Sequence, residues 1–301
     1  MADVVCVASW NVDLVTRVAQ PPARGQTLIG QGLQRLPGGK GSNAAVACAR
    51  QGAHTAVVAG IGDDAFGDMA LALWQHEGID ARHAHRMAGH PSGTALIWVY
   101  DDGDNSIVVV PGANALLGTE HVRAAADLLG SARVVMGSCE VPASALLEAF
   151  ALARQHGALT LFNPAPASAV PDELWPLVDV LSPNEDELAA LSGCADVAQG
   201  AQSLLARGVG AVVVTLGAKG CCLYRAGQAP LALPGRRMRV VDTVGAGDTF
   251  TGALAAALAR EEPWERALAS ANTAAALSTC ERGALAGMPV LAQVQALLAS
   301  D

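Results

Sequence analysis

Aromatic and basic residues are both scarce in this sequence of 301 residues. Phe, Trp and Tyr make up 4% of it, and 19 Lys and Arg are outnumbered by 28 Asp and Glu, giving a formal net charge of -9. No run of Lys or Arg stands out. Nucleic acids and anionic membranes attract clustered positive charge, so neither is expected as a partner.

Long hydrophobic runs and paired cysteines are also absent. Charged or turn residues interrupt every alanine-rich stretch before about 20 residues, the length that spans a bilayer, and the N-terminus MADVVCVASWNVD lacks signal-peptide features. The seven cysteines form no C-x-x-C pair, which predicts neither a disulfide framework nor a zinc site. We therefore expect a cytoplasmic protein.

Apolar residues, at 51% of the chain, are plentiful enough for a folded core. Short Val-rich runs alternate with helical patterns, which predicts βαβ units on a mostly parallel sheet flanked by helices. The expected strands are 4–9, 55–60, 132–137, 158–162 and 211–216. The expected helices are near 43–51, 65–77, 119–129, 142–156, 185–192, 197–207, 248–260, 264–280 and 290–299. No linker or repeat is evident, so 1–301 is expected to be one domain.

Two segments, 14–36 and 94–110, interrupt this alternation. The first has no helical period and contains several Pro and Gly, and the second reads as two strands joined by a turn. Both are expected to be antiparallel additions to the α/β core. A small sheet inserted in this way often covers a substrate site as a lid.

The stretch DTVGAGDTF (242–250) places an acid between a glycine-rich turn and an alanine-rich helix. The backbone N–H groups of Gly245, Ala246 and Gly247 are expected to be uncovered where the helix begins, which predicts an anion site. Asp248 would repel a phosphate there, unless it takes a proton from the group that attacks that phosphate.

Three further motifs each have two interpretations. PGGKGSN (37–43) fails as a Walker A loop, and it is either a ligand loop or a plain turn before a helix. NVD (11–13) follows the first strand, where ligands bind in open α/β sheets, but it is also typical of a turn. In SPNEDEL (182–188), Asn184 and Glu187 fit either a helix capping box or a Mg²⁺ site that acts through waters.

Taken together and in this order, the motifs resemble those of the ribokinase family of sugar kinases. The resemblance spans nearly the whole chain and is carried by NVD (11–13), PGGKGSN (37–43), GDDAFG (62–67), SGTALIWV (92–99), PGAN (111–114), CEVP (139–142), NPAPA (163–167), PNEDE (183–187), TLGAKG (215–220) and DTVGAGDTF (242–250). It implies a three-layer α/β fold with a small β-sheet lid, and ATP-dependent phosphorylation of a sugar hydroxyl.

The same resemblance favours D-ribose as the substrate, with ribose 5-phosphate as the product, because CEVP and NPAPA extend the match beyond motifs that all members share. Fructose, another sugar or a nucleoside stay open as alternatives. A protein of another class, a sugar or nucleotide sensor without catalysis, also stays open, because fold does not secure function.

The resemblance also implies roles for individual residues. Asp248 would be the catalytic base, with the amides of Gly245, Ala246 and Gly247 stabilising the transferring phosphoryl group. The implied sugar-binding residues are Asp13, Gly39, Lys40, Asn43, Glu140 and Asp248. The implied Mg·ATP residues are Asn184, Glu187, Thr215, Gly217 and Asn272, of which Asn184 and Glu187 would orient the waters on Mg²⁺.

A monovalent cation, usually K⁺, is implied beside the anion site. Its implied ligands are Asp242, Val244, Ser278, Glu281 and Gly283. Asp242 is also compatible with a simple cap or turn, and Gly287 stands where the family often has a hydroxyl residue. The resemblance further implies a homodimer formed through the lid sheet, whose strand edges are open to pairing.

Two more features are unusual. Trp10 is bulky for the position before N-x-D, so it is either a core residue or a surface on which a flat ring stacks. Trp98 raises the same question within the lid. The histidines are scattered, and the closest pair, His83 and His85, predicts no metal site.

Overall fold

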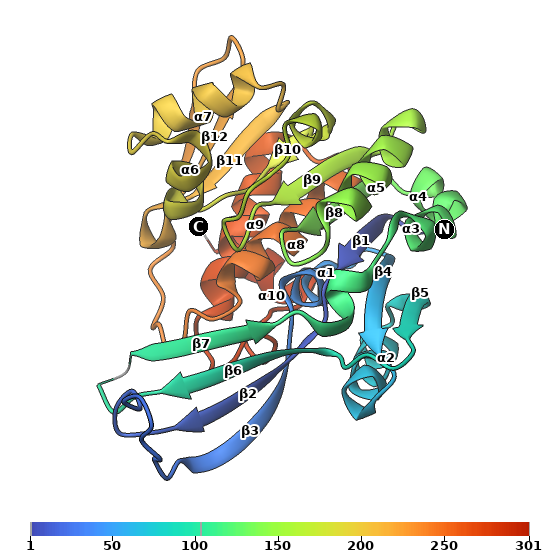
Figure 1. Cartoon of the computed structure of the whole chain (residues 1–301). Coiled ribbons are helices and arrows are strands. Elements are labelled where there is room, and N and C mark those ends of the chain that lie inside the picture. Colours follow the sequence, from blue (N-terminus) through green and yellow to red (C-terminus); the bar gives the residue numbers. More distant parts are fainter. Residues whose placement is uncertain (1, 103, 301) are drawn as a thin grey trace.

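A nine-stranded sheet forms the centre of the computed structural model, which describes residues 2–102 and 104–300 (Figure 1). The strand order is β13-β12-β11-β10-β9-β8-β1-β4-β5. Neighbouring strands run parallel except at β11–β12 and β12–β13. The strands are β1 (Val4–Ala8), β4 (Thr55–Gly62), β5 (Asp80–Met87), β8 (Val134–Ser138), β9 (Leu159–Asn163), β10 (Val180–Leu181), β11 (Ala211–Thr215), β12 (Gly220–Arg225) and β13 (Leu231–Pro234).

The apolar runs explain the centre of this sheet. Every residue of β1, β4 and β8 is buried, as expected for parallel strands that are covered on both faces. In register, Cys6 of β1 lies opposite Val57 on one side and Met136 on the other. All five expected strands are confirmed, and the predicted mostly parallel sheet is confirmed with them.

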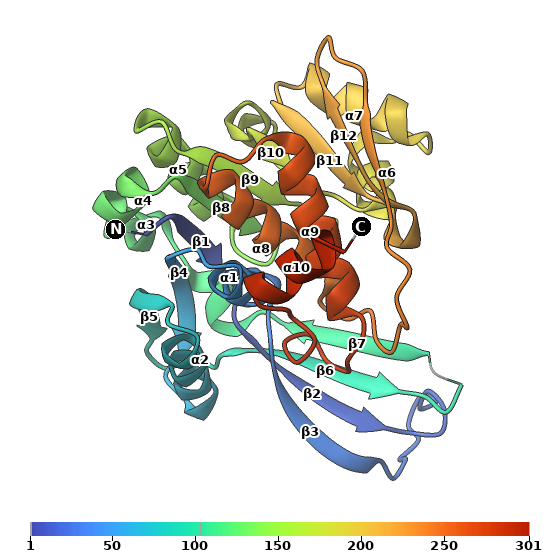
Figure 2. The same cartoon turned by 180° about the vertical axis from the view of Figure 1, so that it is seen from behind.

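Helices cover both faces of the sheet, which gives the predicted three layers (Figures 1 and 2). One face carries α1 (Lys40–Arg50), α2 (Ala65–His76), α8 (Ala246–Ala259), α9 (Trp264–Ser278) and α10 (Leu291–Leu298). The other carries α3 (Thr119–Arg123), α4 (Ala126–Ser131), α5 (Ala143–Gln155), α6 (Glu185–Ser192) and α7 (Val197–Ala206). Short 3₁₀ helices span η1 (Gly112–Leu116), η2 (Asp172–Leu177) and η3 (Gly217–Lys219). No helix of the described chain is long and apolar enough to cross a membrane.

One expected helix, 119–129, is divided into α3 and α4. The N–H of Ala125 donates to the Val122 carbonyl at 3.0 Å, three residues back. A bond that spans three residues instead of the four of an α-helix tightens the turn, and it ends α3 before α4 begins.

Trp10 belongs to the hydrophobic core on the α1 face. Its side chain is 0% exposed, its indole N–H donates to the Phe66 carbonyl at 2.9 Å, and its ring packs edge-on against Trp74 with centroids 5.9 Å apart. The core interpretation is therefore confirmed. Stacking of a ligand on Trp10 is excluded, because no ring face is open.

The second, small sheet has the order β3-β2-β6-β7 and extends from the carboxyl edge of the large one (Figure 1). Its strands are β2 (Asn11–Arg17), β3 (Gln31–Gly38), β6 (Gly93–Val99) and β7 (Asn105–Val110). The predicted segments 14–36 and 94–110 form it, but the strands begin earlier, at Asn11 and Gly93. We call these four strands the small sheet.

The expectation that both additions are antiparallel is only partly correct. β2–β3 and β6–β7 are antiparallel pairs, whereas β2 and β6 run parallel. The reason is the route of the chain. β2 leaves the carboxyl end of β1, and β6 follows β5, which runs in the same direction as β1.

Candidate active site

The candidate site lies where the carboxyl ends of the parallel strands face the small sheet. β1 has β4 on one side and β8 on the other, so the chain changes direction of travel across the sheet there. Ligands of open α/β proteins bind at such a switch point. The ends of β1, β8, β9 and β11 bring Ser9, Glu140, Asn163 and Thr215 to this edge.

Asp248 sits in the first turn of α8, immediately after the glycine-rich turn. It is 8% exposed, and its Oδ2 accepts a hydrogen bond from Asn43 Nδ2 at 2.8 Å. Burial raises the pKa of the Asp248 carboxyl, while Lys40 and the Asn43 amide act in the opposite direction. The result is a buried carboxyl group with a proton affinity above the usual value, which suits a general base.

The turn before Asp248 requires glycine. Gly245 has φ 78°, and a Cβ there would lie 2.8 Å from Cα and Cβ of Ala284. The expectation of three uncovered amides is only partly met, because the Ala246 N–H donates to the Thr243 carbonyl at 3.2 Å. Within the described chain, the N–H groups of Gly245 and Gly247 have no such bond, so they remain available to an anion at the start of α8.

Gly252 brings α8 close to α1. A Cβ at this position would lie 2.3 Å from the Ala44 carbonyl oxygen and 2.6 Å from Cβ of Ala47. This close contact is one helical turn beyond Asp248 and next to Asn43 in the chain. It therefore helps to set the distance across which Asn43 and Asp248 bond.

Lys40 is the first residue of α1, and the charges of four carboxylates act on its ammonium. Burial lowers the pKa of its ammonium, but Asp248, Glu140, Glu187 and Asp13 together raise it above the usual value. The preceding Gly39 has φ 92°, and a Cβ there would lie 2.8 Å from the Ser9 carbonyl oxygen. PGGKGSN does form a turn between β3 and α1, and this turn places a protonated lysine in the site, so its role as a ligand loop stays a prediction.

Glu140 follows β8 and is held by two donors. Its Oε2 accepts from Ser9 Oγ at 2.6 Å and from the Lys40 N–H at 2.8 Å, while burial raises the pKa of the carboxyl. Ser9 Oγ also accepts from the Gly41 N–H at 3.1 Å. Ser9 was not predicted from the sequence, because nothing distinguishes a single serine after a strand.

Asp13 lies on β2, so the turn interpretation of NVD is wrong. Burial, helped by the charges of Glu140 and Asp248, raises the pKa of Asp13 to about 6. A Cβ on Gly38, in the neighbouring strand β3, would lie 2.4 Å from Asp13 Oδ1. Glycine at that position leaves the carboxylate open toward the site.

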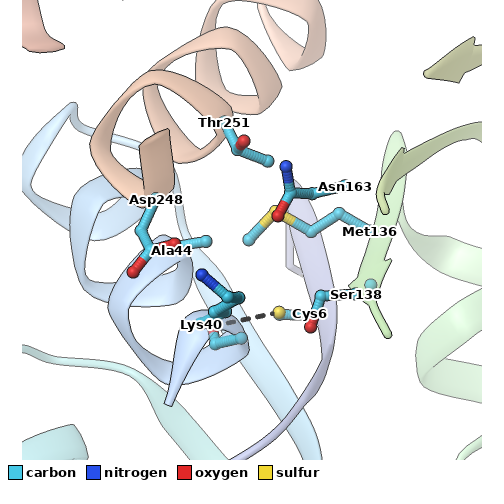
Figure 3. Close-up of a pocket in the computed structure, with 10 residues that line it drawn as sticks. Cys6, Lys40, Ala44, Met136, Ser138, Asn163, Asp248 and Thr251 are labelled. Atoms are coloured by element: carbon cyan, nitrogen blue, oxygen red, sulfur yellow. Dashed lines mark hydrogen bonds between the residues drawn. The ribbon is translucent and has the colours of Figure 1, made fainter. Parts of the chain in front are cut away.

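A narrow cavity continues inward from Lys40 and Asp248. Figure 3 shows the Lys40 ammonium and the side chains of Asn163 and Thr251 around the same space, with Cys6, Met136 and Ser138 completing the wall. Among the residues that the structure describes, the Ser138 and Thr251 hydroxyls have no hydrogen-bond partner. The cavity therefore has two unpaired hydroxyl groups, while the Asn163 amide, in the NPAPA motif, donates to the Ser182 carbonyl at 2.7 Å.

Asn184 and Glu187 form a capping box at the start of α6. Asn184 Oδ1 accepts from the Glu187 N–H at 2.8 Å, and Glu187 Oε2 accepts from the Asn184 N–H at 2.9 Å. Burial raises the pKa of Glu187, and of the nearby charges Lys40 lowers it while Asp248 raises it. The cap is thus real, and the hard oxygens of the pair equally fit a water-mediated Mg²⁺ site.

The other nucleotide-binding candidates form two groups. The Thr215 N–H donates to the Pro183 carbonyl at 2.9 Å, which places Thr215 beside Asn184, and Gly217 follows with φ 55°. Asn272 lies apart from them on α9, and its Nδ2 donates to the Pro234 carbonyl at 2.7 Å. The structure therefore joins Thr215 to the capping box but gives Asn272 a separate contact.

Asp242 connects the turn before α8 to the loop after α9. Its Oδ1 accepts from the Val244 N–H at 3.0 Å and its Oδ2 from the Gly283 N–H at 2.9 Å. The bonds fit both a turn acid and a cation ligand, since each carboxylate oxygen keeps a further lone pair. Carboxylate and carbonyl oxygens are suitable donors for a hard cation.

Gly287 has a structural reason to lack a side chain. A Cβ there would lie 2.1 Å from the carbonyl oxygen of Ser278. A hydroxyl residue at 287 would therefore displace the backbone of one of the predicted cation ligands. Among the described residues, no group of three or more His, Cys, Asp or Glu is arranged to hold a metal ion.

Comparison with known proteins agrees with this geometry. Residues 1–291 match the pfkB family of carbohydrate kinases. The ribokinase of Mus musculus is 38% identical over 297 residues, which cover 96% of this chain and 92% of the relative.

Two solved structures are similar over nearly the whole length. A ribokinase from Thermotoga maritima has a TM-score of 0.92 at 32% identity. The match covers 99% of this chain and 100% of the Thermotoga chain. The Arabidopsis thaliana ribokinase complexed with ribose and ATP has a TM-score of 0.92 at 30% identity. The match covers 99% of this chain and 98% of the Arabidopsis chain. The fold implied by the motif order is confirmed, and the chain belongs to the pfkB family of carbohydrate kinases.

Proposed function

We propose that this protein transfers the γ-phosphoryl group of ATP to a hydroxyl of D-ribose, giving ribose 5-phosphate. The observation that carries the proposal is the buried Asp248 carboxyl, bonded to Asn43 and placed at the start of α8. The similarity to ribokinases over the whole chain, one of them complexed with ribose and ATP, supports the choice of substrates.

In this reaction Asp248 accepts the proton of the attacking sugar hydroxyl. The amides of Gly245 and Gly247, with a smaller contribution from the engaged Ala246 amide, stabilise negative charge on the phosphoryl group, and the dipole of α8 adds to them. The sugar is held by Asp13, Gly39, Lys40, Asn43 and Glu140. The small sheet lies over the sugar as a lid and excludes water, which strengthens these charged interactions.

Mg·ATP occupies the side of the site formed by α6 and β11. Asn184 and Glu187 would hold the waters of Mg²⁺, Thr215 and Gly217 would contact the nucleotide there, and Asn272 would contact it from α9. When bound, the ion neutralises charge on the phosphates. Lys40, which its carboxylate neighbours keep protonated, adds a positive charge between the sugar side and the nucleotide side.

ADP release with Mg·ATP tests the proposal across ribose, 2-deoxyribose, fructose, other sugars and nucleosides. The highest kcat/KM is expected with ribose. A preference for fructose or another sugar would replace the substrate but keep the chemistry, and a preference for a nucleoside would require a site other than Trp10 for its base. Binding of ribose and ATP without ADP release would support the sensor alternative.

We also propose that K⁺ binds beside the turn that precedes α8, at Asp242 and the carbonyls of Val244, Ser278, Glu281 and Gly283. Replacing K⁺ by tetramethylammonium is expected to lower kcat about tenfold, which corresponds to about 1.4 kcal/mol of transition-state stabilisation. Steady-state rates at constant ionic strength measure this. Equal rates in both salts would contradict the cation site.

A homodimer through the small sheet is the final part of the proposal. The sheet has two edge strands, β3 and β7, and open edges favour pairing with another chain. Apolar side chains are exposed on it and in the segment before β3, namely Ile29, Leu33, Leu36, Ile107, Val108, Val109 and Val110. Light scattering is expected to give twice the mass of one chain, and Val109→Lys is expected to shift it toward the monomer. A monomeric wild-type protein would contradict this.

A further inference from the structure

Arg50, the last residue of α1, binds the loop that follows α9. Its Nη1 donates to the carbonyl oxygens of Leu285 at 2.6 Å and Met288 at 3.0 Å. Its Nε and Nη2 donate to the two carboxylate oxygens of Glu77 at 3.0 and 2.7 Å. The Arg50 and Glu77 side chains are 22% and 10% exposed, so the carboxylate neutralises a largely buried guanidinium.

The next residue strengthens the same contact. Gln51 is 1% exposed, and its Nε2 donates to the Pro289 carbonyl at 2.8 Å. Two consecutive residues at the end of α1 thus bind carbonyls of 285, 288 and 289. The carbonyls that they bind lie more than 230 residues further along the chain. The contacts therefore fix tertiary structure rather than a local turn.

The same loop is attached to the anion turn at its other end. Asp242 Oδ2 accepts from the Gly283 N–H, and Gly287 packs directly on the Ser278 carbonyl. The carbonyls of Leu285 and Met288 accept from Arg50, and neither residue is among the proposed cation ligands. Arg50 therefore binds a part of the loop that is separate from the proposed ligands.

The start of α1 lies in the sugar site, where Lys40 and Asn43 contact Glu140 and Asp248. With 11 residues, α1 is about 16 Å long. It is one rigid element with the sugar-binding residues at one end and the loop contact at the other.

We propose that Arg50 is a positioning residue that holds loop 281–288 in place beside the anion turn and thereby sets the response of turnover to a monovalent cation. The inference deepens the proposed kinase function and rests on its cation site. A lysine cannot replace the arginine fully, because one ammonium does not present the planar fork that bonds two carbonyls and a carboxylate together.

The first test is a K⁺ titration of ribose phosphorylation in wild type, Arg50→Lys and Arg50→Met. The K⁺ concentration that gives half-maximal rate is expected to rise about tenfold in Arg50→Met, as for loss of a charge-assisted hydrogen bond, and less in Arg50→Lys. KM for ribose should change little, and saturating K⁺ should restore much of kcat. The matched control is Arg82→Met, which removes an exposed arginine that pairs with Asp80 and should behave as wild type.

A merely structural role would lower kcat at every K⁺ concentration and leave the half-maximal concentration unchanged, which would overturn the proposal. The second test does not depend on activity. Hydrogen exchange measured by mass spectrometry is expected to increase in 279–288 of Arg50→Lys, with α1 unchanged. Unchanged exchange in the loop would also overturn it.

The two tests separate the inference from the proposed function. A wild-type rate that does not respond to K⁺ refutes the cation site and the cation half of the inference, while the exchange result still decides whether Arg50 positions the loop. No phosphorylation of any acceptor refutes the kinase proposal itself.

Discussion

Replacing Asp248 by asparagine is expected to lower kcat by about 10²- to 10⁴-fold, the usual contribution of a positioned general base. The amide has the same shape, and its oxygen can still accept from Asn43 Nδ2, so the bond at 2.8 Å is kept. Folding and ATP binding should therefore be preserved. Steady-state kinetics, urea denaturation and ATP titration measure the three quantities.

The control for this change is Asp127→Asn, on an exposed position of α4. A near-normal kcat in Asp248→Asn would refute the role of base. The pH profile gives an independent check. Because burial raises the pKa of Asp248, kcat/KM of the wild type should fall on the acid side as this carboxyl takes up a proton, and the variant should lack that limb.

The second large effect is expected from Asp13→Asn, which should raise KM for ribose roughly 10- to 100-fold. The proposed contacts of Asp13 are hydrogen bonds from sugar hydroxyls to a carboxylate, and bonds to charged groups contribute about 1.5–3 kcal/mol each. The amide offers one acceptor and no charge. The effect should be confined to the sugar, so KM for ATP measured in parallel serves as the control.

The same change should stabilise the fold at neutral pH. Asp13 has a pKa of about 6 in the folded protein against an ordinary value of 3.8, so the folded state binds more protons between these values. The free energy of unfolding therefore falls as pH rises through this range, and the full destabilisation by the charged Asp13 carboxylate is present above pH 6. Asp13→Asn removes it and should increase the free energy of unfolding by about 1–3 kcal/mol at pH 8.

Urea denaturation at two pH values measures this gain. The difference between variant and wild type should be largest at pH 8 and vanish below about pH 3, where Asp13 is protonated in both states. A gain that is equal at both pH values would show that packing rather than charge is responsible. A loss of stability at pH 8 would contradict the burial cost altogether.

Much of the fold was predictable because the sequence patterns are local. Continuous apolar runs mark the fully buried strands β1, β4 and β8, and Gly39 and Gly245 mark turns that need positive φ. β10 was missed because a strand of two residues is too short to form a pattern. β5 was missed because its sequence, DARHAHRM, alternates polar residues at the edge of the sheet.

The site was predictable only where it lies in motifs. The resemblance implied Asp248, Lys40 and Glu140, which the structure brings together, but it did not point to Ser9 or Arg50. Both act through partners more than 100 residues away, and no local period records such a contact. The parallel pairing of β2 with β6 escaped prediction for the same reason, because it depends on the route of the chain through the large sheet.

The way in which the small sheet is attached determines how it can move. Trp10, just before β2, exchanges two hydrogen bonds with Asn114, just after β7, and Ser92, just before β6, is bonded twice by Asp64. These fixed points lie side by side at the base of the sheet, where Asn11 pairs with Gly93.

If the small sheet acts as the proposed lid, these contacts make a rotation about its base the expected opening motion. At about 3.3 Å per residue, Asp13 lies about 7 Å beyond Asn11, whereas Arg17 lies about 20 Å beyond it. In such a rotation displacement grows with distance from the axis, so the far end of the sheet would move far while Asp13 would move little. The carboxylate proposed to bind the sugar would thus be in position before the sheet closes.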